Sequence, residues 1–357
     1  MKGGERVHDD DLLLEVQDLH TQFHTSNGIV QAVRGVDFTV WRGETVGIVG
    51  ESGCGKSVTM ASIMRLLPDN GRIARGSIRF QGQDLATLSE TKMQAVRGHR
   101  IGMIFQDPMT SLNPVFTIER QLTEHLIKHQ GVSKRVARAK AVDMLDLVGI
   151  PSPKERLAQY PHEFSGGMRQ RVCIAIALIT DPALLIADEP TTALDVTIQA
   201  QILELLQRLR EELGTAIVLI THDLGVIAGT CDRVLVMYGG KVAEEGSVED
   251  VFYRPGHPYS WGLLGSVPDP EVDTDERLVP IEGQPPDLLA PPPGCGFAPR
   301  CAYAMRVCLD QPPALHEVLD SSAGHRARCW LHHGAAPAEA REEVAAARGR
   351  FAAEEAA

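Results

Sequence analysis

The residues from Gly50 to Ser57 have the types and spacing that bind nucleotide phosphates. They read Gly-Glu-Ser-Gly-Cys-Gly-Lys-Ser, which fits the pattern G-x-x-x-x-G-K-[ST]. Glycines in such a loop let backbone N–H groups surround phosphate oxygens, the lysine reaches the β- and γ-phosphates, and the last hydroxyl reaches Mg²⁺. A helix that begins at the end of the loop adds a favourable dipole. We therefore expect Lys56 and Ser57 to bind a nucleotide with its magnesium ion.

Two carboxylates follow an apolar stretch at residues 184–187. The stretch Leu-Leu-Ile-Ala is typical of a buried strand, and it ends in Asp188 and Glu189. An aspartate at this place can hold Mg²⁺, and a glutamate can polarise an attacking water. An isolated Asp-Glu pair is more often solvated and without a role, so this interpretation depends on the phosphate loop upstream. With that loop, we predict a magnesium ligand at Asp188 and a catalytic group at Glu189.

Three further groups are expected at the ends of strands or helices. His222 follows the apolar run 216–220, and Gln106 follows the run 101–105, so both should lie at the edge of a sheet where α/β proteins bind ligands. Ser165 and the two glycines after it precede an apolar helical run and predict a second anion-binding helix end. Each has a structural alternative: a structural histidine, a surface glutamine and a simple helix cap.

The elements that position these residues follow from hydrophobic periodicity. Strands are expected over residues 12–49, interrupted at residues 27–28 and 42–43, followed by a helix from Lys56. Helical spacing over residues 117–150 predicts an insertion, and short apolar runs at 183–187, 216–220 and 234–238 predict a mostly parallel sheet. The sequence therefore predicts an α/β protein with a helical insertion, which carries Ser165 away from the phosphate loop.

Charge and apolar runs exclude several classes of protein. The 357 residues include 35 Lys and Arg against 47 Asp and Glu, and a net charge of −12 argues against non-specific binding of nucleic acid. The start of the chain lacks the basic and apolar regions of a signal peptide, which predicts a cytoplasmic protein. The longest clean apolar run, 172–179, is far shorter than the roughly 20 residues that span a bilayer.

The C-terminal part changes in composition. Prolines at 280, 285, 286, 291, 292 and 293 predict an irregular, extended segment, and the tail from residue 335, nearly all Ala, Glu and Arg, is predicted to be mobile. Four of the seven cysteines gather here, at Cys295, Cys301, Cys308 and Cys329. Their spacing matches neither the Cys-x₂-Cys pairs of zinc sites nor the cysteine runs of ferredoxins. Spacing alone therefore leaves three alternatives: free thiols, a zinc site and an iron–sulfur cluster.

Taken in order, residues 12–263 resemble the ATP-binding subunit of ATP-binding cassette (ABC) transporters. The resemblance implies a Walker A loop at 50–57, a Q-loop at Gln106, a signature at 165–167, a Walker B pair at 188–189, a D-loop at 193–195 and a switch histidine at His222. Glu189, His222 and Lys56 would be catalytic, and Ser57, Gln106 and Asp188 would hold Mg²⁺. Phe164 and Met168 depart from the common signature Leu-Ser-Gly-Gly-Gln. The implied nucleotide contacts are Phe23, Gly50, Ser52, Gly53, Cys54, Gly55, Lys56, Ser57, Val58, Gln106, Ser165, Gly166, Gly167 and Asp195.

Two motifs resemble one branch of this family, the oligopeptide, dipeptide and nickel importers. They are Gln-Asp-Pro-Met-Thr-Ser-Leu-Asn-Pro at 106–114 and Gly-His-Pro-Tyr at 256–259. The branch implies a nucleotide-binding domain at 11–263 with a helical part near 107–175, an extension at 264–334 and a tail at 335–357. It also implies a [4Fe–4S] cluster on Cys295, Cys301, Cys308 and Cys329, with zinc as the alternative.

The resemblance predicts an ATPase that energises solute import from the cytoplasmic face of the membrane. Its partners would be two permease subunits, a second and often non-identical ATP-binding subunit, and an extracellular solute-binding protein, with no nucleic acid. Two subunits would close head to tail on ATP and reopen after hydrolysis. Peptides are the favoured solute, ahead of nickel, glutathione-like molecules and sugars. A soluble ABC ATPase of DNA repair or translation is the competing hypothesis, and the C-terminal cysteines could be a structural staple or a redox sensor.

Overall fold

The computed structural model describes residues 11–107, 111–192, 194–266 and 281–352. They divide between two compact units, whose bounds are 1–15, 39–45 and 79–220 for the first and 16–38, 46–78 and 221–357 for the second. Residues 108–110 of the predicted importer motif, residue 193 of the predicted D-loop and the proline at 280 lie outside the described residues. The domain boundaries given above stay a prediction.

The first unit contains three parallel strands whose side chains are buried on both faces. β6 (Ile101–Ile104) pairs with β7 (Leu184–Asp188), and β7 pairs with β8 (Ala216–Ile220), both in parallel register. Continuous apolar runs of this kind are typical of parallel strands covered on both faces. The predicted parallel strands at 184–187 and 216–220 are confirmed, and they place the residues that follow them at the carboxyl edge.

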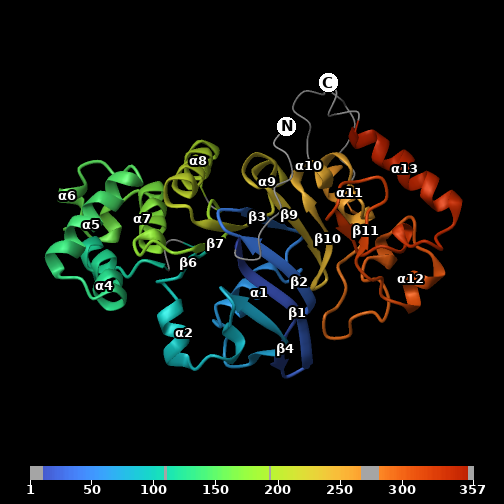
Figure 1. Ribbon diagram of the computed structural model, residues 1–357, viewed down its shortest axis with the longest axis horizontal. Coiled ribbons are helices and arrows are strands. Elements are labelled where there is room, and N and C mark those ends of the chain that lie inside the picture. The colour runs from blue at the N-terminus through green and yellow to red at the C-terminus, as the bar shows by residue number, and fades with distance from the viewer. Residues whose placement is uncertain (1–10, 108–110, 193, 267–280, 353–357) are drawn as a thin grey trace. The chain divides into compact units, whose positions relative to one another are not determined.

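The helical insertion is also confirmed in the first unit (Figure 1). It comprises α4 (Ile118–Gln130), α5 (Lys134–Leu147), α6 (Pro153–Arg156) and α7 (Gly166–Leu178). Thr117, Ser133 and Ser165 cap α4, α5 and α7 by accepting a backbone N–H three residues on. α2 (Glu90–Val96) precedes the insertion and α8 (Val196–Leu213) follows it.

The second unit builds a mixed sheet around β9 (Arg233–Tyr238). β3 (Thr45–Val49) pairs with β9 in parallel, whereas β10 (Lys241–Ser247) pairs with it antiparallel. α1 (Lys56–Ile63), α9 (Leu224–Thr230), α10 (Val248–Tyr253) and α11 (Pro258–Leu264) complete this part. The predicted strand at 234–238 and the predicted helix from Lys56 are thereby confirmed.

A separate four-stranded sheet has the order β2-β1-β4-β5. Its strands are β1 (Leu12–Thr25), β2 (Gly28–Trp41), β4 (Gly71–Phe80) and β5 (Gln83–Asp84). The interruptions between β1 and β2 and between β2 and β3 fall where the sequence predicted them, at residues 26–27 and 42–44. Glycine at 28 and 43 adopts positive φ there, which explains the position of both turns.

The C-terminal segment is less irregular than predicted. Residues 281–297 contain no helix or strand, as the prolines indicated, but β12 (Arg326–Ala327) pairs antiparallel with β10 and with β11 (His316–Glu317). α12 (Arg306–Asp310) lies between them in the chain. The segment therefore joins the sheet of the second unit, which composition alone did not indicate.

Residues 338–352 form a helix, α13 (Ala338–Ala352), where the sequence predicted a mobile tail. Val344 is buried, and Phe351 packs against the same apolar cluster, which includes Trp261 and Leu331. Residues seven apart share one face of a helix. The sequence did not predict this helix because only two large apolar residues, Val344 and Phe351, mark its buried face.

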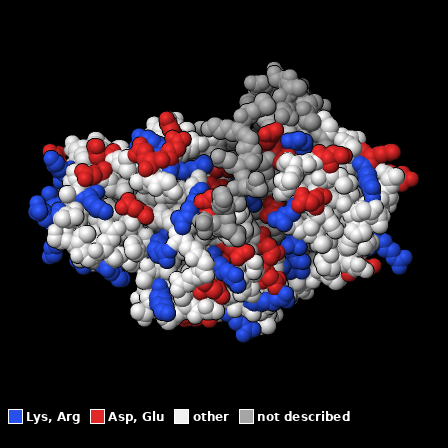
Figure 2. Space-filling model, in the orientation of Figure 1, with Lys and Arg blue, Asp and Glu red and all other residues white. Residues whose placement is uncertain are grey.

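Among the described residues no helix is long and apolar enough to cross a membrane. On the face shown in Figure 2, Lys and Arg side chains are interspersed with Asp and Glu.

Candidate functional site

The phosphate loop connects β3 to α1 in the second unit and needs glycine at two positions. Gly50 and Gly55 adopt φ of +150° and +104°. A Cβ atom on Gly50 would lie 2.2 Å from the carbonyl oxygen of Met237, and one on Gly55 would lie 2.6 Å from that of Ala32. Both backbone approaches exclude any side chain, so these glycines fix the path of the loop into the helix.

The side chain of Lys56 folds back onto the backbone of this loop. Its side chain is buried, and its Nζ donates hydrogen bonds to the carbonyl oxygens of Gly50 at 2.7 Å and Glu51 at 3.1 Å. Ser57 is exposed on the first turn of α1. Burial is the main cause that raises the pKa of the Cys54 thiol, so this loop residue stays neutral. The loop thus presents one buried cation beside exposed backbone and a hydroxyl, as phosphate binding requires.

His222 and Phe23 also belong to the second unit. His222 follows the end of β8 and is exposed, while the next residue, Asp223, caps α9 through the backbone N–H of Val226 at 3.2 Å. Phe23 lies near the end of β1 with its ring against Gly71, where a Cβ atom would lie 2.8 Å from the ring. The predicted placement of His222 at the end of a strand is therefore confirmed, and its role stays a prediction.

The first unit brings Gln106 and Glu189 into direct contact. Nε2 of Gln106 donates to Oε2 of Glu189 at 2.9 Å, although 83 residues separate them. The hydroxyl of Thr192 donates to the same oxygen at 2.8 Å, a contact that sequence reasoning missed. Glu189 has φ of +48°, unusual for a residue with a side chain. Asp188 before it is buried at the end of β7. Two of the residues predicted to act on magnesium and water are thus neighbours.

The signature residues and Asp195 begin two adjacent helices. The Ser165 hydroxyl accepts the backbone N–H of Met168 at 3.4 Å, and the Asp195 carboxylate accepts that of Ile198 at 3.0 Å. A Cβ atom on Gly167 would lie 3.1 Å from the Ile198 side chain, so the two helix starts are close together. Ser165 therefore caps a helix, and the exposed glycine beside it leaves that N-terminus accessible to an anion.

The predicted site residues are divided between the two units. Gln106, the signature, the Walker B pair and Asp195 belong to the first unit, and the phosphate loop, Phe23 and His222 belong to the second. The contact of Gln106 with Glu189 joins two predicted site residues of the first unit that are 83 positions apart in the sequence.

Two residues from later in the chain, Tyr259 and Arg300, bind the phosphate loop, and the sequence did not predict either contact. The backbone N–H of Glu51 donates to the Tyr259 hydroxyl at 2.8 Å. Arg300 donates to both carboxylate oxygens of Glu51, at 2.7 and 3.0 Å. Tyr259 belongs to the Gly-His-Pro-Tyr motif at 256–259, but Glu51 is 208 residues away and no sequence signal connects the two residues.

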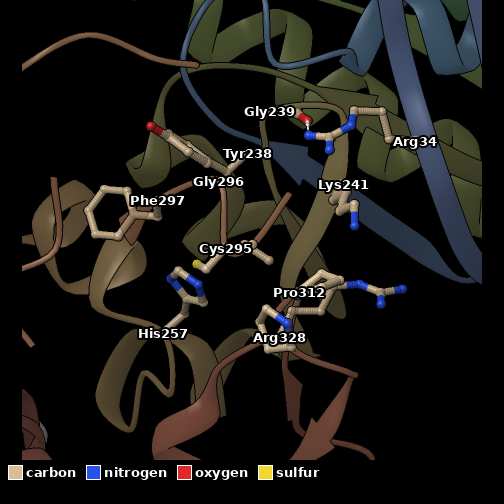
Figure 3. A pocket seen from close by; sticks show the side chains of 13 residues that line it. Arg34, Tyr238, Gly239, Lys241, His257, Cys295, Gly296, Phe297, Pro312 and Arg328 are labelled. Atoms are coloured by element: carbon tan, nitrogen blue, oxygen red, sulfur yellow. Dashed lines mark hydrogen bonds between the residues drawn. The ribbon is translucent and has the colours of Figure 1, made fainter. Parts of the chain in front are cut away.

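The four C-terminal cysteines line one small cavity together with apolar side chains such as Phe297 and Leu331. Burial is the main cause that raises the pKa of the Cys295, Cys301 and Cys329 thiols, that of Cys301 to about 11. Cys295 also lines an adjoining cavity with basic side chains (Figure 3). In the described part of the chain, no group of three or more His, Cys, Asp or Glu side chains is arranged so that it could hold a metal ion. The iron–sulfur cluster and the zinc alternative therefore stay predictions.

Comparisons with known proteins agree with the resemblance. Residues 33–192 match the family model described as ABC transporter, and residues 243–308 match that of the oligopeptide/dipeptide transporter C-terminal region. The chain is 56% identical over 326 residues to the oligopeptide transport ATP-binding protein OppD of Bacillus subtilis (strain 168), covering 91% of this chain and 90% of that protein. This chain belongs to the ABC transporter family. It is an ATPase subunit whose hydrolysis energises transport.

Other relatives of this ABC transporter subunit are similar over most of its length. The dipeptide transport ATP-binding protein DppD of the same Bacillus strain is 57% identical over 320 residues, covering 89% of this chain and 94% of that protein. A dimeric post-hydrolysis structure of the ATP-binding cassette MJ0796, bound to ADP and Pi, has a TM-score of 0.60 at 28% identity, covering 66% of this chain and 99% of that one. The predicted α/β ATPase fold is thereby confirmed.

Proposed function

We propose that this ATPase subunit energises the import of dipeptides and oligopeptides. The observation that carries the proposal is the presence, in one chain, of the cassette match at 33–192 and the oligopeptide/dipeptide C-terminal match at 243–308. Relatives named for oligopeptide and dipeptide transport, at 56% and 57% identity, support the same solute class. Nickel, glutathione-like molecules and sugars are the alternatives that a solute screen would separate.

The residues of the second unit bind ATP in this proposal. Lys56 leaves the carbonyl oxygens of its own loop to contact the β- and γ-phosphates, and the backbone N–H groups of the loop surround them. The adenine stacks on Phe23, and His222 positions the γ-phosphate. Support comes from the burial of Lys56 and from the strand and loop geometry that holds it.

Hydrolysis itself depends on the first unit. Glu189 orients and deprotonates the attacking water, and its hydrogen bonds to Gln106 and Thr192 fix the direction of its carboxylate. Asp188, Ser57 and Gln106 would hold Mg²⁺, which supplies charge stabilisation for the phosphoryl group when bound. A carboxylate, a hydroxyl and a side-chain amide all offer oxygen atoms, which are the ligands that Mg²⁺ prefers, so these three side chains fit this cation.

The signature acts on ATP held by a second subunit. Ser165, Gly166 and Gly167 lie at the exposed start of α7, and Asp195 lies at the neighbouring start of α8. Two subunits that close head to tail would each offer this helix end to the other's nucleotide, and hydrolysis would let them reopen. The dimeric state of the ATP-binding cassette MJ0796 supports such an arrangement. We propose that the second subunit is a related, non-identical chain.

Membrane partners complete the proposed importer. Two permease subunits would bind this chain at the cytoplasmic face of the membrane, and an extracellular solute-binding protein would deliver the peptide to them. Affinity purification of the tagged chain from native membranes in mild detergent, followed by mass spectrometry, tests this. Recovery of two permeases and a second ATP-binding subunit is expected. Recovery of ribosomal or DNA-repair proteins alone would contradict the proposal.

A [4Fe–4S] cluster on Cys295, Cys301, Cys308 and Cys329 is a further part of the proposal. Its support is that all four thiols line one cavity, and thiolates are the usual ligands of such clusters. The thiols would have to turn toward one another to ligate it. When bound, the cluster would crosslink a segment that has few helices and strands. Iron and acid-labile sulfide in near-equal amounts after anaerobic purification would support it, and zinc or no metal would contradict it.

A further inference from the structure

Arg300 makes as many hydrogen bonds as a guanidinium can donate. Its Nη atoms donate to both oxygens of the Glu51 carboxylate at 2.7 and 3.0 Å. The other N–H groups donate to the Tyr238 hydroxyl at 3.2 Å and to the carbonyl oxygens of Ile281 and Glu282 at 3.0 and 2.8 Å. Five N–H groups thus have five acceptors, and the side chain is 3% exposed. A guanidinium with every donor used has a single orientation.

Glu51, the second residue of the phosphate loop, is held at its side chain and at both of its backbone polar groups. Arg300 binds the carboxylate, the Tyr259 hydroxyl accepts the backbone N–H at 2.8 Å, and the carbonyl oxygen accepts from Lys56 at 3.1 Å. Lys56 is the residue proposed to reach the phosphates. The C-terminal segment and the phosphate-binding lysine are therefore connected through one residue.

A 3₁₀ turn and a group of packed aromatic rings hold Arg300 in place. Arg300 ends a 3₁₀ turn, Ala298–Arg300, and its N–H donates to the carbonyl oxygen of Phe297 at 2.9 Å. The ring of Phe297 packs against those of Tyr238 and Tyr259, with centroids 5.3 and 5.5 Å apart. The guanidinium lies 5.8 and 5.9 Å from the rings of Tyr238 and Phe297. Aromatic packing and backbone bonding together fix the place from which Arg300 reaches the loop.

We propose that the C-terminal segment positions the phosphate loop for ATP, and that Arg300 is the positioning residue. The loop contains three glycines at positive φ, so it would otherwise have to be ordered when the nucleotide binds. Holding Glu51 in place beforehand removes part of that entropy loss and so strengthens binding of the phosphates. This inference rests on the proposed binding of ATP by the same loop.

Affinity for a non-hydrolysable ATP analogue with Mg²⁺, measured by calorimetry on the purified full chain, tests the proposal. Arg300→Met should weaken binding about tenfold, since a charge-assisted pair of hydrogen bonds is lost. Arg300→Lys should give an intermediate loss, because an ammonium cannot bind both carboxylate oxygens as a guanidinium does. Arg306→Met, which removes an exposed arginine of the same segment, should bind the analogue as wild type does.

A double-mutant cycle with Glu51→Gln separates positioning from general stability. If Arg300 acts through Glu51, the affinity of the double variant for the ATP analogue should be no lower than that of the single variant with the lower affinity. Equal affinity in wild type and Arg300→Met, with only a lower unfolding temperature, would overturn the proposal. If Arg300→Met fails to fold, Tyr259→Phe carries the test, and a two- to threefold weaker affinity is expected. Absence of binding by the wild-type chain would contradict the proposed function itself.

Discussion

Two glutamates, one in each unit, are supported in opposite ways. Glu189 in the first unit is half-buried on a left-handed backbone, and Gln106 and Thr192 both donate to its Oε2. Glu244 in the second unit is fully buried in the middle of β10. The first arrangement combines backbone strain with access to solvent, which is common at sites that do chemistry.

Glu244 shows what a structural carboxylate needs instead. Its Oε1 accepts from the Gly256 backbone at 2.5 Å and contacts Nε2 of His325 at 2.7 Å, and its Oε2 accepts from the His257 backbone at 2.9 Å. His325 is itself fully buried and contacts the Ser321 hydroxyl at 2.6 Å. A buried network of this kind holds one arrangement because an unpaired member would be costly. The proposal gives Glu189 a role in hydrolysis, whereas the contacts of Glu244 hold neighbouring segments of the second unit together.

Replacement of Glu189, the proposed catalytic glutamate, should have the largest effect. In Glu189→Gln, the general base is lost while the shape and the contact with Gln106 remain, so steady-state ATP hydrolysis by the assembled transporter should fall about a thousandfold. Binding of MgATP and the free energy of unfolding should change little. The exposed Glu204→Gln serves as the matched control. Undiminished hydrolysis would remove Glu189 from this role.

Breaking the buried pair should affect stability and not chemistry. His325→Leu leaves the Glu244 carboxylate buried beside an apolar side chain, and we expect the free energy of unfolding to fall by about 3 kcal/mol. Urea unfolding of the full chain measures this, with the exposed His24→Leu as control. Loss of hydrolysis per folded molecule at unchanged stability would contradict the division between the two glutamates.

Acid should destabilise the second unit through His257. Burial lowers the pKa of His257 to about 4 from 6.5, and its Nδ1 accepts the backbone N–H of Tyr259 at 3.0 Å. The unfolded chain gains a proton near pH 6.5 while the folded chain does not, so stability is lost as the pH falls from 6.5 toward 4. Between pH 7 and pH 5 we expect a loss of about 2 kcal/mol.

The variant His257→Asn isolates this histidine in the pH experiment. Burial also lowers the pKa of His125, His129 and His316, and these groups change stability in the same direction. Asparagine keeps a helix cap but does not titrate in this range. The unfolding free energy of the variant should therefore vary less between pH 7 and pH 5 than that of wild type, and an equal dependence would exclude His257 as the cause.

The smallest effect is expected at the residue that sequence reasoning missed beside Glu189. Thr192→Val removes one of the two hydrogen bonds to Oε2 and keeps the size of the side chain. A single hydrogen bond of about 1 kcal/mol predicts about a fivefold fall in hydrolysis. Ser62→Ala, which removes a hydroxyl contact with Thr21 far along α1, should leave the rate unchanged and is the control. A loss as large as that of Glu189→Gln would contradict this ranking.

The phosphate loop, Asp188 and Glu189 could be predicted because their signals are local. Gly50 and Gly55 are required by close backbone approaches, and the carboxylates follow a run of buried residues that only a covered strand has. Gln106 needed the additional knowledge that carboxyl ends of parallel strands share an edge. For these residues, pattern and topology were enough to predict their places at strand ends, and their roles stay predictions.

The support of the loop could not be predicted because it depends on partners distant in sequence. Glu51 and Arg300 are 249 residues apart, and nothing in the composition around Arg300 distinguishes it from a surface arginine. The short strand β12 and the helix α13 were missed for a related reason. β12 pairs with β10 through only two residues. In α13, Val344 and Phe351 alone mark the apolar face.

Transport in reconstituted vesicles tests whether ATP hydrolysis by this chain drives solute import. The chain would be purified with its permease partners, and uptake of a labelled dipeptide and a labelled oligopeptide would be measured with the solute-binding protein outside. We expect ATP-dependent accumulation of the peptides that Glu189→Gln abolishes. Accumulation that continues without ATP hydrolysis, or hydrolysis that never moves a peptide, would contradict it.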